Sequence, residues 1–333
     1  MGFNSDVLHL VEKNTKKKKR ENMLMTIGFV SGEDTIIKVY DHHGEMKDAP
    51  SYNYEIGSVT KTFTTSLMAK FASENRLDLN DSIQKYLKDL PHNQYYPTLK
   101  RLATHTSGYS SFVPFQLTEY MNMLVGAVVK GCIKNNPFYD KSQINWMSII
   151  QSKQLKDQDY KYAYSNFGIS ILGHILSLLA NKNYSAAMDD FIANDLGLSN
   201  TYVGTYRKTN LHGYNKANQD CGNWQWGTDN FFAPSGAITS TAEDLLLYVK
   251  HQMGNEKPYL SLCHQKHAAA TKKFDIGLGW EIHKNSNLIY KDGGTGCFTS
   301  YVGFEKSKRR GAVVLSNYLL LNIAKIGEAL LTK

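Results

Sequence analysis

The spacing of apolar residues changes several times along the chain, and each change marks an expected element. Residues 5–14 have the period of a short amphipathic helix, and the strand-like residues 23–30 follow the basic run Lys16–Arg20. Ser31-Gly32-Glu33-Asp34 predicts a turn, because the β-branched residues 35–40 come directly after it as a return strand. The first forty residues therefore predict a helix and a β-hairpin.

From Ser58 the pattern takes the period of a helix. Phe63, Leu67 and Phe71 fall at positions i, i+4 and i+8, which gives one apolar stripe that continues to about Glu74. Ser58 therefore lies in the first turn of an expected helix.

The rest of the chain predicts helices first and strands later. Residues 76–234 are mainly helical in pattern, with helices expected at 146–154 and 167–180. A further helix is expected at 241–252, where Thr241 is a suitable N-cap. Short β-rich runs then predict strands before a last helix; these elements are residues 278–282, 288–291, 300–304, 311–316 and the helix 322–331.

This order predicts an α/β (α+β) fold. Strands at both ends of the chain, with helices between them, indicate one antiparallel sheet flanked by helices. We expect residues 1–75 and 235–333 to form a discontinuous sheet domain, and residues 76–234 to form an inserted, mainly helical lobe. The length of 333 residues agrees with two lobes, because it exceeds what most single cores hold.

Composition and charge exclude several classes of protein. Apolar residues make up 42% of the chain and charged residues 20%, as in a folded globular protein. The net charge of +8 would suit an anionic partner, but much of the excess lies in Lys16–Arg20 without interleaved aromatic residues. We therefore expect that run to be solvated and expect no nucleic-acid partner. No stretch approaches the roughly 20 apolar residues that cross a bilayer, so no transmembrane segment is expected.

No metal site and no cofactor are expected. The cysteines lie far apart and form no Cys-x-x-Cys pair, so neither a zinc cluster nor a redox motif is indicated, and their redox state is left open. The paired histidines lack a carboxylate at zinc-site spacing and are interpreted as surface polar groups. These residues are Cys132, Cys221, Cys263 and Cys297, and His42, His43, His264 and His267.

The candidate chemistry begins with the pattern Ser-x-x-Lys at Ser58-Val59-Thr60-Lys61. On a helix, positions i and i+3 share a face, which brings the Lys61 ammonium near the Ser58 hydroxyl. A lysine becomes a base only if burial or another cation lowers its pKa, so Ser58 should lie at a helix start inside a cleft. The backbone amide of Ser58 would then also be free to bind an oxyanion.

The same pattern occurs a second time, at Ser82-Ile83-Gln84-Lys85. This copy follows Asp78, Asn80 and Asp81, so we interpret Ser82 as the cap of a short surface helix. The pattern alone therefore does not identify the nucleophile.

Two further motifs favour Ser58. Tyr164-Ser165-Asn166 precedes the helix at 167–180, and Lys291-Asp292-Gly293 is followed by Gly294-Thr295-Gly296 between two expected strands. The order Ser-x-x-Lys, Tyr-x-Asn, Lys-x-Gly resembles the serine β-lactamase and penicillin-binding protein family, nearest its class C β-lactamase and D-alanyl-D-alanine carboxypeptidase branch. The resemblance covers about residues 50–320 and includes the strings at 102–108, 196–201, 235–245 and 291–304.

The resemblance implies a role for each catalytic motif residue. Ser58 would be the acylated nucleophile and Lys61 its proton partner. Tyr164 would be a second base, provided that nearby ammonium groups stabilise its phenolate. Asn166 would bind the substrate amide and steady Lys61.

The resemblance also implies the substrate-binding strand. Lys291, Asp292 and Gly293 would lie along the cleft, and the amides of Ser58 and Gly294 would form the oxyanion hole. The β-lactamase/transpeptidase-like fold is implied as well.

Plainer interpretations exist for each motif taken alone. Tyr164 can be a half-buried core residue and Asn166 a helix cap, and Asp292-Gly293 can belong to a hairpin turn. His105, in the string at 102–108, is interpreted as structural because no acidic partner is evident near it.

Three departures from the family pattern bear on the substrate. A Glu-x-x-Leu-Asn loop typical of class A enzymes is absent from the sequence, which disfavours that class. Asp292 stands where the family usually has threonine or serine beside the substrate carboxylate, and like charges repel. Cys297 stands where glycine is frequent, and the sequence gives no account of it.

The sequence therefore predicts a serine hydrolase that acts through an acyl-enzyme on a D-Ala-D-Ala-type peptide or a β-lactam. An esterase or D-amino-acid amidase or aminopeptidase on the same fold is the first alternative. A non-enzymatic penicillin-binding sensor or scaffold, and a module that binds anions or a membrane surface through residues 16–20, are the others. An extracytoplasmic location is expected if a leader has been removed; the cytoplasm is the alternative.

Overall fold

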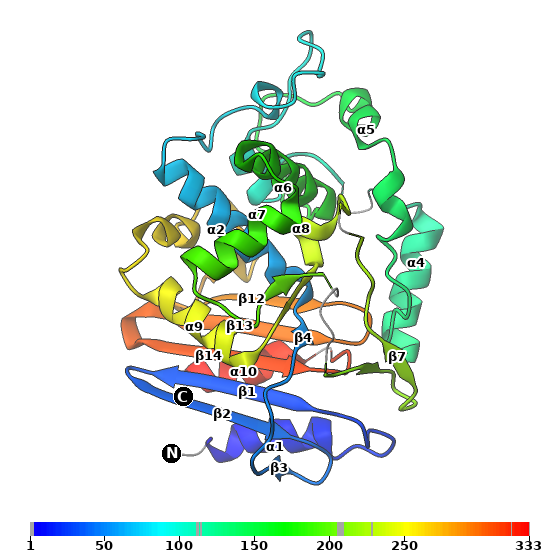
Figure 1. Cartoon of the computed structure of the whole chain (residues 1–333), viewed down its shortest axis with the longest axis vertical. Coiled ribbons are helices and arrows are strands. Elements are labelled where there is room, and N and C mark those ends of the chain that lie inside the picture. The colour runs from blue at the N-terminus through cyan, green and yellow to red at the C-terminus, as the bar shows by residue number, and fades with distance from the viewer. Residues whose placement is uncertain are drawn as a thin grey trace.

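A large antiparallel sheet occupies one end of the molecule, and most of the helices lie above it (Figure 1). The structure is a computed structural model that describes residues 3–110, 113, 115–204, 210–227, 229–320 and 322–332. The sheet has nine strands in the order β3-β2-β1-β14-β13-β12-β11-β10-β9. Their bounds are β1 Met25–Ser31, β2 Asp34–Tyr40, β3 Glu45–Met46, β9 Ala268–Ala269, β10 Phe274–Ile276, β11 Glu281–His283, β12 Ile289–Gly294, β13 Thr299–Glu305 and β14 Arg310–Ser316.

The two ends of the chain build this sheet together. Strand β1 pairs with β2 on one side and with β14 on the other, in an antiparallel register that sets Met25 opposite Ser316. Helices α1 (Ser5–Thr15) and α10 (Ile323–Thr332) cover one face, and α9 (Ala242–Met253) packs on the other. The predicted antiparallel sheet flanked by helices is confirmed.

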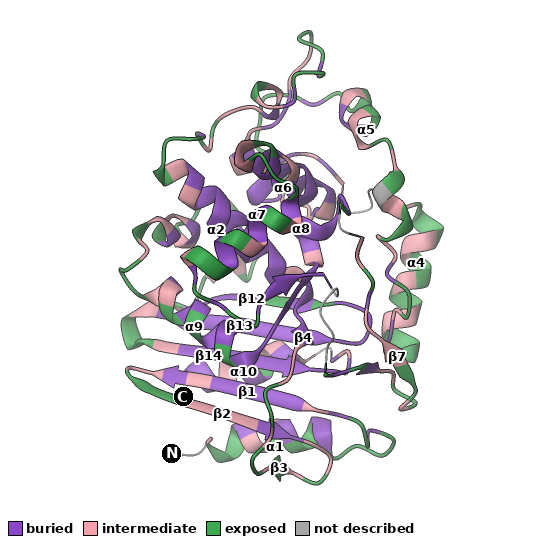
Figure 2. Cartoon of the chain, in the orientation of Figure 1, coloured by how far each residue is buried: buried purple, intermediate pink, exposed green. Residues whose placement is uncertain are grey.

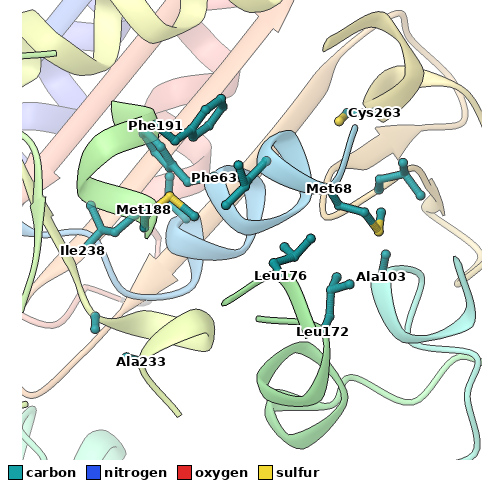
Figure 3. Packing of buried hydrophobic residues seen from close by; sticks show 14 of the residues in the cluster. Phe63, Met68, Ala103, Leu172, Leu176, Met188, Phe191, Ala233, Ile238 and Cys263 are labelled. Atoms are coloured by element: carbon teal, nitrogen blue, oxygen red, sulfur yellow. The ribbon is translucent and has the colours of Figure 1, made fainter. Parts of the chain in front are cut away.

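Helix α2 (Thr60–Ser73) runs through the centre of the molecule. Eleven of its fourteen residues are buried, so the single apolar stripe expected from the sequence is too narrow. Figure 3 shows Phe63 and Met68 among apolar side chains from several other elements. The buried hydroxyls of α2 are satisfied by hydrogen bonds: Thr62 donates to the Val59 carbonyl oxygen and Thr65 to that of Leu278.

The middle of the chain is mainly helical, with short strands that the sequence did not predict. The longest helix, α6 (Asn166–Ala180), is capped by Ser165. Two small sheets lie outside the large one. In β4-β8-β5 a strand from the middle of the chain joins one strand that precedes the middle and one that follows it, whereas both strands of β6-β7 belong to the middle. The remaining bounds are α3 Leu99–Ala103, α4 Leu117–Val125, α5 Trp146–Ser152, α7 Tyr184–Asp190, α8 Ala233–Gly236, β4 Tyr54–Glu55, β5 Tyr202–Val203, β6 Gly213–Tyr214, β7 Asp220–Gly222 and β8 Ile238–Ser240.

One apolar core extends through both expected lobes. Phe63, Leu172 and Phe304 belong to the same buried cluster, although Leu172 lies in the helical part and the other two in the sheet part. Strand β5 also pairs with β8 across the expected boundary at residue 234. The division at residues 76 and 234 stays a prediction.

The basic run differs from the expectation at its last residue. Lys16 to Lys19 are exposed, but Arg20 is buried. The Arg20 guanidinium donates to the Asn14 carbonyl oxygen at 2.8 Å and lies over the Tyr318 ring. A solvated Arg20 was therefore the wrong prediction, because its side chain is buried between the end of α1 and the Tyr318 ring. Within the described residues, no helix is both long and apolar enough to span a membrane.

Candidate active site

Ser58 lies in η1 (Gly57–Val59), a single 3₁₀ turn directly before α2. Strand β12 passes so close to this turn that side chains would not fit between them. A Cβ atom on Gly293 would lie 2.1 Å from the Ile56 carbonyl oxygen and 2.8 Å from the Ser58 nitrogen. Gly57 has φ of +50°, and a Cβ there would lie 2.6 Å from the Gly294 nitrogen. The glycines therefore bring the Ser58 and Gly294 backbones together.

Lys61 lies one helical turn after Ser58, as the spacing predicted. Its Nζ is 3.2 Å from Ser58 Oγ and donates to the Ser235 carbonyl oxygen at 2.5 Å. Burial, followed by the positive charge of Lys291, holds the pKa of Lys61 well below its usual range, and Asp292 only partly opposes this. The surroundings of Lys61 therefore favour the neutral amine over the ammonium form.

Tyr164 reaches the nucleophile from the loop before α6. Its hydroxyl donates to Ser58 Oγ at 2.6 Å, and its ring centre is 4.8 Å from Lys61 Nζ and 5.1 Å from Lys291 Nζ. Burial raises the pKa of Tyr164, and the lowering by Lys291 and by the Ser58 hydrogen bond does not cancel it. Burial therefore favours the protonated phenol, and the role of Tyr164 as a second base stays a prediction.

His105 fixes the position of Tyr164. The Ser165 amide donates to His105 Nδ1 at 3.1 Å, and the His105 ring centre lies 4.7 Å from that of Tyr164. Burial and the charges of Lys61 and Lys291 hold the pKa of His105 well below its usual range, so the imidazole is neutral. The geometry agrees with the structural interpretation of His105.

Asn166 is the half-buried first residue of α6. The cap of this helix is Ser165, whose side chain accepts from the Gly168 amide, so the interpretation of Asn166 as the cap is wrong. Among the described residues, the hydrogen-bond partners of Lys61 Nζ are Ser58 and Ser235, not Asn166. The Ser235 carbonyl oxygen belongs to the string at 235–245, but its contact with Lys61 could not be predicted, because a backbone oxygen leaves no side-chain signal in the sequence.

Lys291 lies on β12 and makes a buried ion pair that the sequence did not reveal. Its Nζ is 2.6 Å from Oε1 of Glu281, on the neighbouring strand β11. Burial opposes the charged form, but Glu281, with Tyr164 and Asp292 nearby, holds the pKa of Lys291 well above its usual range. Lys291 is therefore a permanent cation whose charge is already paired.

Asp292 and Gly293 follow in the same strand rather than in a turn. The strand β12 extends to Gly294, and Asp292 is exposed while its neighbours Lys291 and Gly293 are buried. The hairpin-turn interpretation of this motif is therefore wrong. Asp292 is close enough to bear on the pKa of Lys61, Tyr164 and Lys291.

Glu55 supports the same region from three residues before Ser58. It is fully buried, and its Oε1 accepts from the Trp224 amide at 2.7 Å. Burial raises the pKa of Glu55 to about 7. The Glu55 side chain therefore links the segment after β7, at Trp224, to the residues just before η1 and α2.

Three of the four cysteines meet beside β12. Cys132 and Cys297 form a disulfide, and the sulfur of Cys221 lies within 4.8 Å of both. The disulfide ties the chain after residue 130 to the turn that follows Gly294, where the Ile133 amide also donates to the Gly296 carbonyl oxygen at 2.9 Å. This pairing gives Cys297 the structural account that the sequence lacked.

The second Ser-x-x-Lys pattern serves a different purpose. Ser82 is the N-cap of the 3₁₀ turn η2 (Ile83–Lys85) and accepts from the Gln84 amide. Lys85 Nζ is bound to Asp81 at 2.8 Å and is exposed. The geometry therefore supports the interpretation of Ser82 as a cap.

Similarity to known proteins agrees with this arrangement. A model of the family described as beta-lactamase matches residues 40–322. The chain belongs to the beta-lactamase family. Both the family and its fold are those of serine hydrolases, and the resemblance stated from the three motifs is confirmed.

Solved structures with about one fifth sequence identity share the fold of this chain. A class C beta lactamase from Rhodobacter sphaeroides has a TM-score of 0.76 at 19% identity, and the match covers 98% of this chain and 99% of that one. The octameric penicillin-binding protein homologue from Pyrococcus abyssi also has a TM-score of 0.76, at 20% identity, and the match covers 97% and 75%. These matches confirm the β-lactamase/transpeptidase-like fold.

Curated relatives are longer than this chain. Protein flp of Staphylococcus aureus (strain MW2) is 25% identical over 314 residues, which covers 87% of this chain and 57% of that protein. A beta-lactamase from Providencia stuartii is 29% identical over 208 residues, which covers 61% of this chain and 48% of that protein. The chain thus spans about half the length of these relatives.

Proposed function

We propose that this beta-lactamase family member is a serine acyl-transfer hydrolase with Ser58 as its nucleophile. The single observation that supports this most is the environment of Ser58 Oγ. It lies within hydrogen-bonding distance of a buried amine, Lys61, and of a protonated phenol, Tyr164. A neutral amine can accept the Ser58 proton, and a phenol can give one up, so the pair supplies both halves of proton transfer.

The proposed reaction has two steps. Ser58 Oγ attacks the carbonyl carbon of an ester or amide while Lys61 Nζ takes its proton, and the negative oxygen is bound by the amides of Ser58 and Gly294. The bond to the leaving group then breaks, with a proton supplied through Tyr164, and an acyl ester remains on Ser58. In the second step water attacks this ester, and Lys61 Nζ takes a proton from the water and returns it to Ser58 Oγ as the ester bond breaks. The carboxylic acid then leaves and the serine is free again.

The charge around Lys291 bears on the substrate. A free cation there would attract a substrate carboxylate, but Lys291 is paired with Glu281, and Asp292 adds a second negative charge beside it. A substrate carboxylate about 4 Å from Asp292 would be repelled by roughly 1 to 4 kcal/mol, depending on screening. We therefore propose that esters and D-amino-acid amides without a free carboxylate are the better substrates, and that D-Ala-D-Ala peptides and β-lactams are the weaker ones.

A penicillin-binding sensor or scaffold is a proposal of lower rank. A penicillin-binding sensor would form a stable acyl-enzyme without turnover, but a scaffold needs no neutral lysine against a serine.

The Cys132–Cys297 disulfide favours an oxidising compartment, so we propose an extracytoplasmic location.

Burst kinetics test the proposed function. The chain is mixed with an activated ester that lacks a carboxylate and, separately, with a penicillin, and product release is followed from milliseconds onward. We expect a burst of one equivalent followed by turnover with the ester, and slower acylation by the penicillin. Hydrolysis without acyl-enzyme formation, or no reaction with either donor, would contradict the proposal. A burst without turnover would identify a sensor instead.

A further inference from the structure

The helix α4 and the turn after it carry an unusual concentration of exposed apolar side chains. Of the nine large apolar side chains that are exposed in the described residues, six lie between residues 117 and 129. They are Leu117, Met121, Leu124, Val125, Val128 and Val129, with exposed fractions from 41% to 66%. A contiguous apolar surface of this kind on a folded protein marks a contact with something else.

The six side chains share one face. Their positions follow i, i+4, i+7, i+8, i+11 and i+12 through α4 and the π-helical turn η3 (Gly126–Lys130), which is the spacing of one helix stripe. We call this set the α4 stripe. No residue of α4 is fully buried, and the helix lies at the margin of the molecule (Figure 1), where Figure 2 colours it exposed or intermediate.

The helix is nevertheless held firmly at both ends. Near its start, Glu119 accepts from the Gln116 amide and from Lys141 Nζ, at 2.8 and 2.9 Å. Beyond its end, Cys132 is bonded to Cys297, and the Lys216 amide donates to the Lys130 carbonyl oxygen at 3.0 Å. The α4 stripe is therefore a fixed feature of the surface.

Positive charge flanks one end of the α4 stripe. Lys130, Lys134 and Lys216 are exposed, and Lys216 Nζ donates to the Val128 carbonyl oxygen. The acidic group near Lys134 is Asp220, whose carboxylate accepts from His212 and from the Gly222 amide. An apolar helix face bordered by lysines matches the boundary between lipid headgroups and acyl chains, with negative headgroups beside the lysines.

The composition of the stripe favours a lipid surface over a protein partner. Tight protein interfaces are centred on tryptophan, tyrosine or arginine that enter pockets. The α4 stripe contains only leucine, methionine and valine on a convex helix, which suits a deformable apolar medium. We propose that the α4 stripe is a docking surface for a membrane that contains anionic lipids.

This docking would also orient the candidate active site. The Cys132–Cys297 bond joins the segment after the stripe to the turn that follows Gly294, at the edge of the proposed oxyanion hole. A chain bound through the α4 stripe would therefore hold Ser58 at a fixed distance from the lipid surface, within reach of acyl donors presented there. The docking itself does not depend on the proposed function.

Vesicle sedimentation tests the proposal. The full chain is mixed with vesicles of neutral phosphatidylcholine, or of phosphatidylcholine with one quarter phosphatidylglycerol, at about 0.1 M salt. We expect binding to the anionic vesicles and little to the neutral ones. The double variant Leu124→Gln/Val128→Gln should bind at least about tenfold more weakly, because two side chains that enter the bilayer lose their apolar surface.

Matched variants distinguish vesicle binding through the α4 stripe from binding through other exposed apolar side chains and from binding through the basic run. Leu178→Gln/Leu247→Gln makes the same kind of change at exposed leucines on α6 and α9 and should bind like the unaltered chain. Lys130→Gln/Lys134→Gln should weaken binding to anionic vesicles, whereas Lys17→Gln/Lys18→Gln should not. Acylation by a soluble ester reports on folding in every variant and is expected to be unchanged.

Three results would overturn the proposal. One is no binding of the unaltered chain to anionic vesicles. Another is binding that survives Leu124→Gln/Val128→Gln but is lost in Lys17→Gln/Lys18→Gln, which would assign it to the basic run. The third is a dimer in sedimentation equilibrium without lipid that becomes a monomer in Leu124→Gln/Val128→Gln. That result would make the α4 stripe an interface between two copies of the chain.

Discussion

The hydroxyl of Ser58 has two neighbours with opposite roles in proton transfer. Lys61 is pushed toward its neutral form by burial and by Lys291, and Tyr164 is kept protonated by burial. These shifts support our proposal that the amine is the base and the phenol the proton donor. The sequence-based expectation that the phenol acts as a second base stays a prediction, because burial raises the pKa of Tyr164 while Lys291 lowers it.

The lowered pKa of Lys61 predicts the acid side of the pH profile. Acylation of Ser58 should persist at neutral pH and decline as the pH falls through the lowered pKa, because protonated Lys61 cannot accept the serine proton. Rates of ester acylation measured by rapid quench across pH will check this. Lys61→Ala should reduce the rate about 10²- to 10⁴-fold and remove that limb. An activity that appears only near pH 10, where an ordinary lysine titrates at about 10.4, would contradict the assignment.

Asp292 predicts the selectivity between charged and neutral donors. Asp292→Thr removes a negative charge from an exposed position on β12. We expect acylation by a penicillin, which carries a carboxylate, to rise about tenfold, since 1.4 kcal/mol of relieved repulsion is a factor of ten. Acylation by a neutral ester should change less than about threefold and serves as the internal control. An equal effect on both donors would show that Asp292 does not select by charge.

Among the elements, the contact between η1 and β12 is the one that places the nucleophile. It depends on the absence of a side chain at Gly293, where a Cβ would lie 2.1 Å from the Ile56 carbonyl oxygen. Ser300 strengthens the contact, because its Oγ donates to the same oxygen at 2.7 Å.

Gly293→Ala should therefore displace β12 from η1 and lower the acylation rate. A shift of about 1 Å costs on the order of 10²-fold when reacting groups must be aligned. Gly227→Ala, at a position with no atom within 4 Å of the added Cβ, is the matched control. Stopped-flow acylation with both variants checks this. Near-normal acylation by Gly293→Ala would mean that β12 does not set the geometry of Ser58.

The sequence predicted the long elements well and the short ones poorly. Helices such as α2, α6 and α9 have many apolar residues in period, so their existence follows from local pattern. Strands β4, β5 and β8 have two or three residues each and exist only because they pair with one another. The expected strand 278–282 was placed too early, since β11 begins at Glu281 and pairs with β12 through Glu281 and Ile282, and β9 and β10 were missed.

The candidate site shows the same limit. Ser58, Lys61, Tyr164 and Lys291 were found because each belongs to a motif with a fixed spacing. The Ser235 carbonyl oxygen, 174 residues from Lys61, and the Glu281 carboxylate were not, because they reach the site through the fold. For Glu281, the available signal in the sequence was its position directly after Trp280, which is buried.

At the scale of the whole molecule, a covalent bond connects distant parts of the chain. The Cys132–Cys297 disulfide closes a loop with a sequence separation of 165 residues and links the helical part to the sheet. A loop of this length restricts the unfolded chain strongly, which stabilises the native state by about 2–5 kcal/mol.

Cys132→Ser should therefore lower the free energy of unfolding by about 2–5 kcal/mol. Urea denaturation under non-reducing conditions measures this change. Cys221→Ser is the control, because Cys221 lies beside the disulfide without being part of it, and it should leave the free energy within about 0.5 kcal/mol. Equal stability of Cys132→Ser and the unaltered chain would show that the bond contributes nothing to folding.

The most direct test of the central claim is the mass of the protein after exposure to an activated ester, followed by tandem mass spectrometry of its peptides. We predict one acyl group per chain, located on Ser58, and no adduct in Ser58→Ala. Ser82→Ala, the change at the other Ser-x-x-Lys pattern, should acquire the adduct normally. An adduct that persists in Ser58→Ala and disappears in Ser82→Ala would contradict the assignment of the nucleophile.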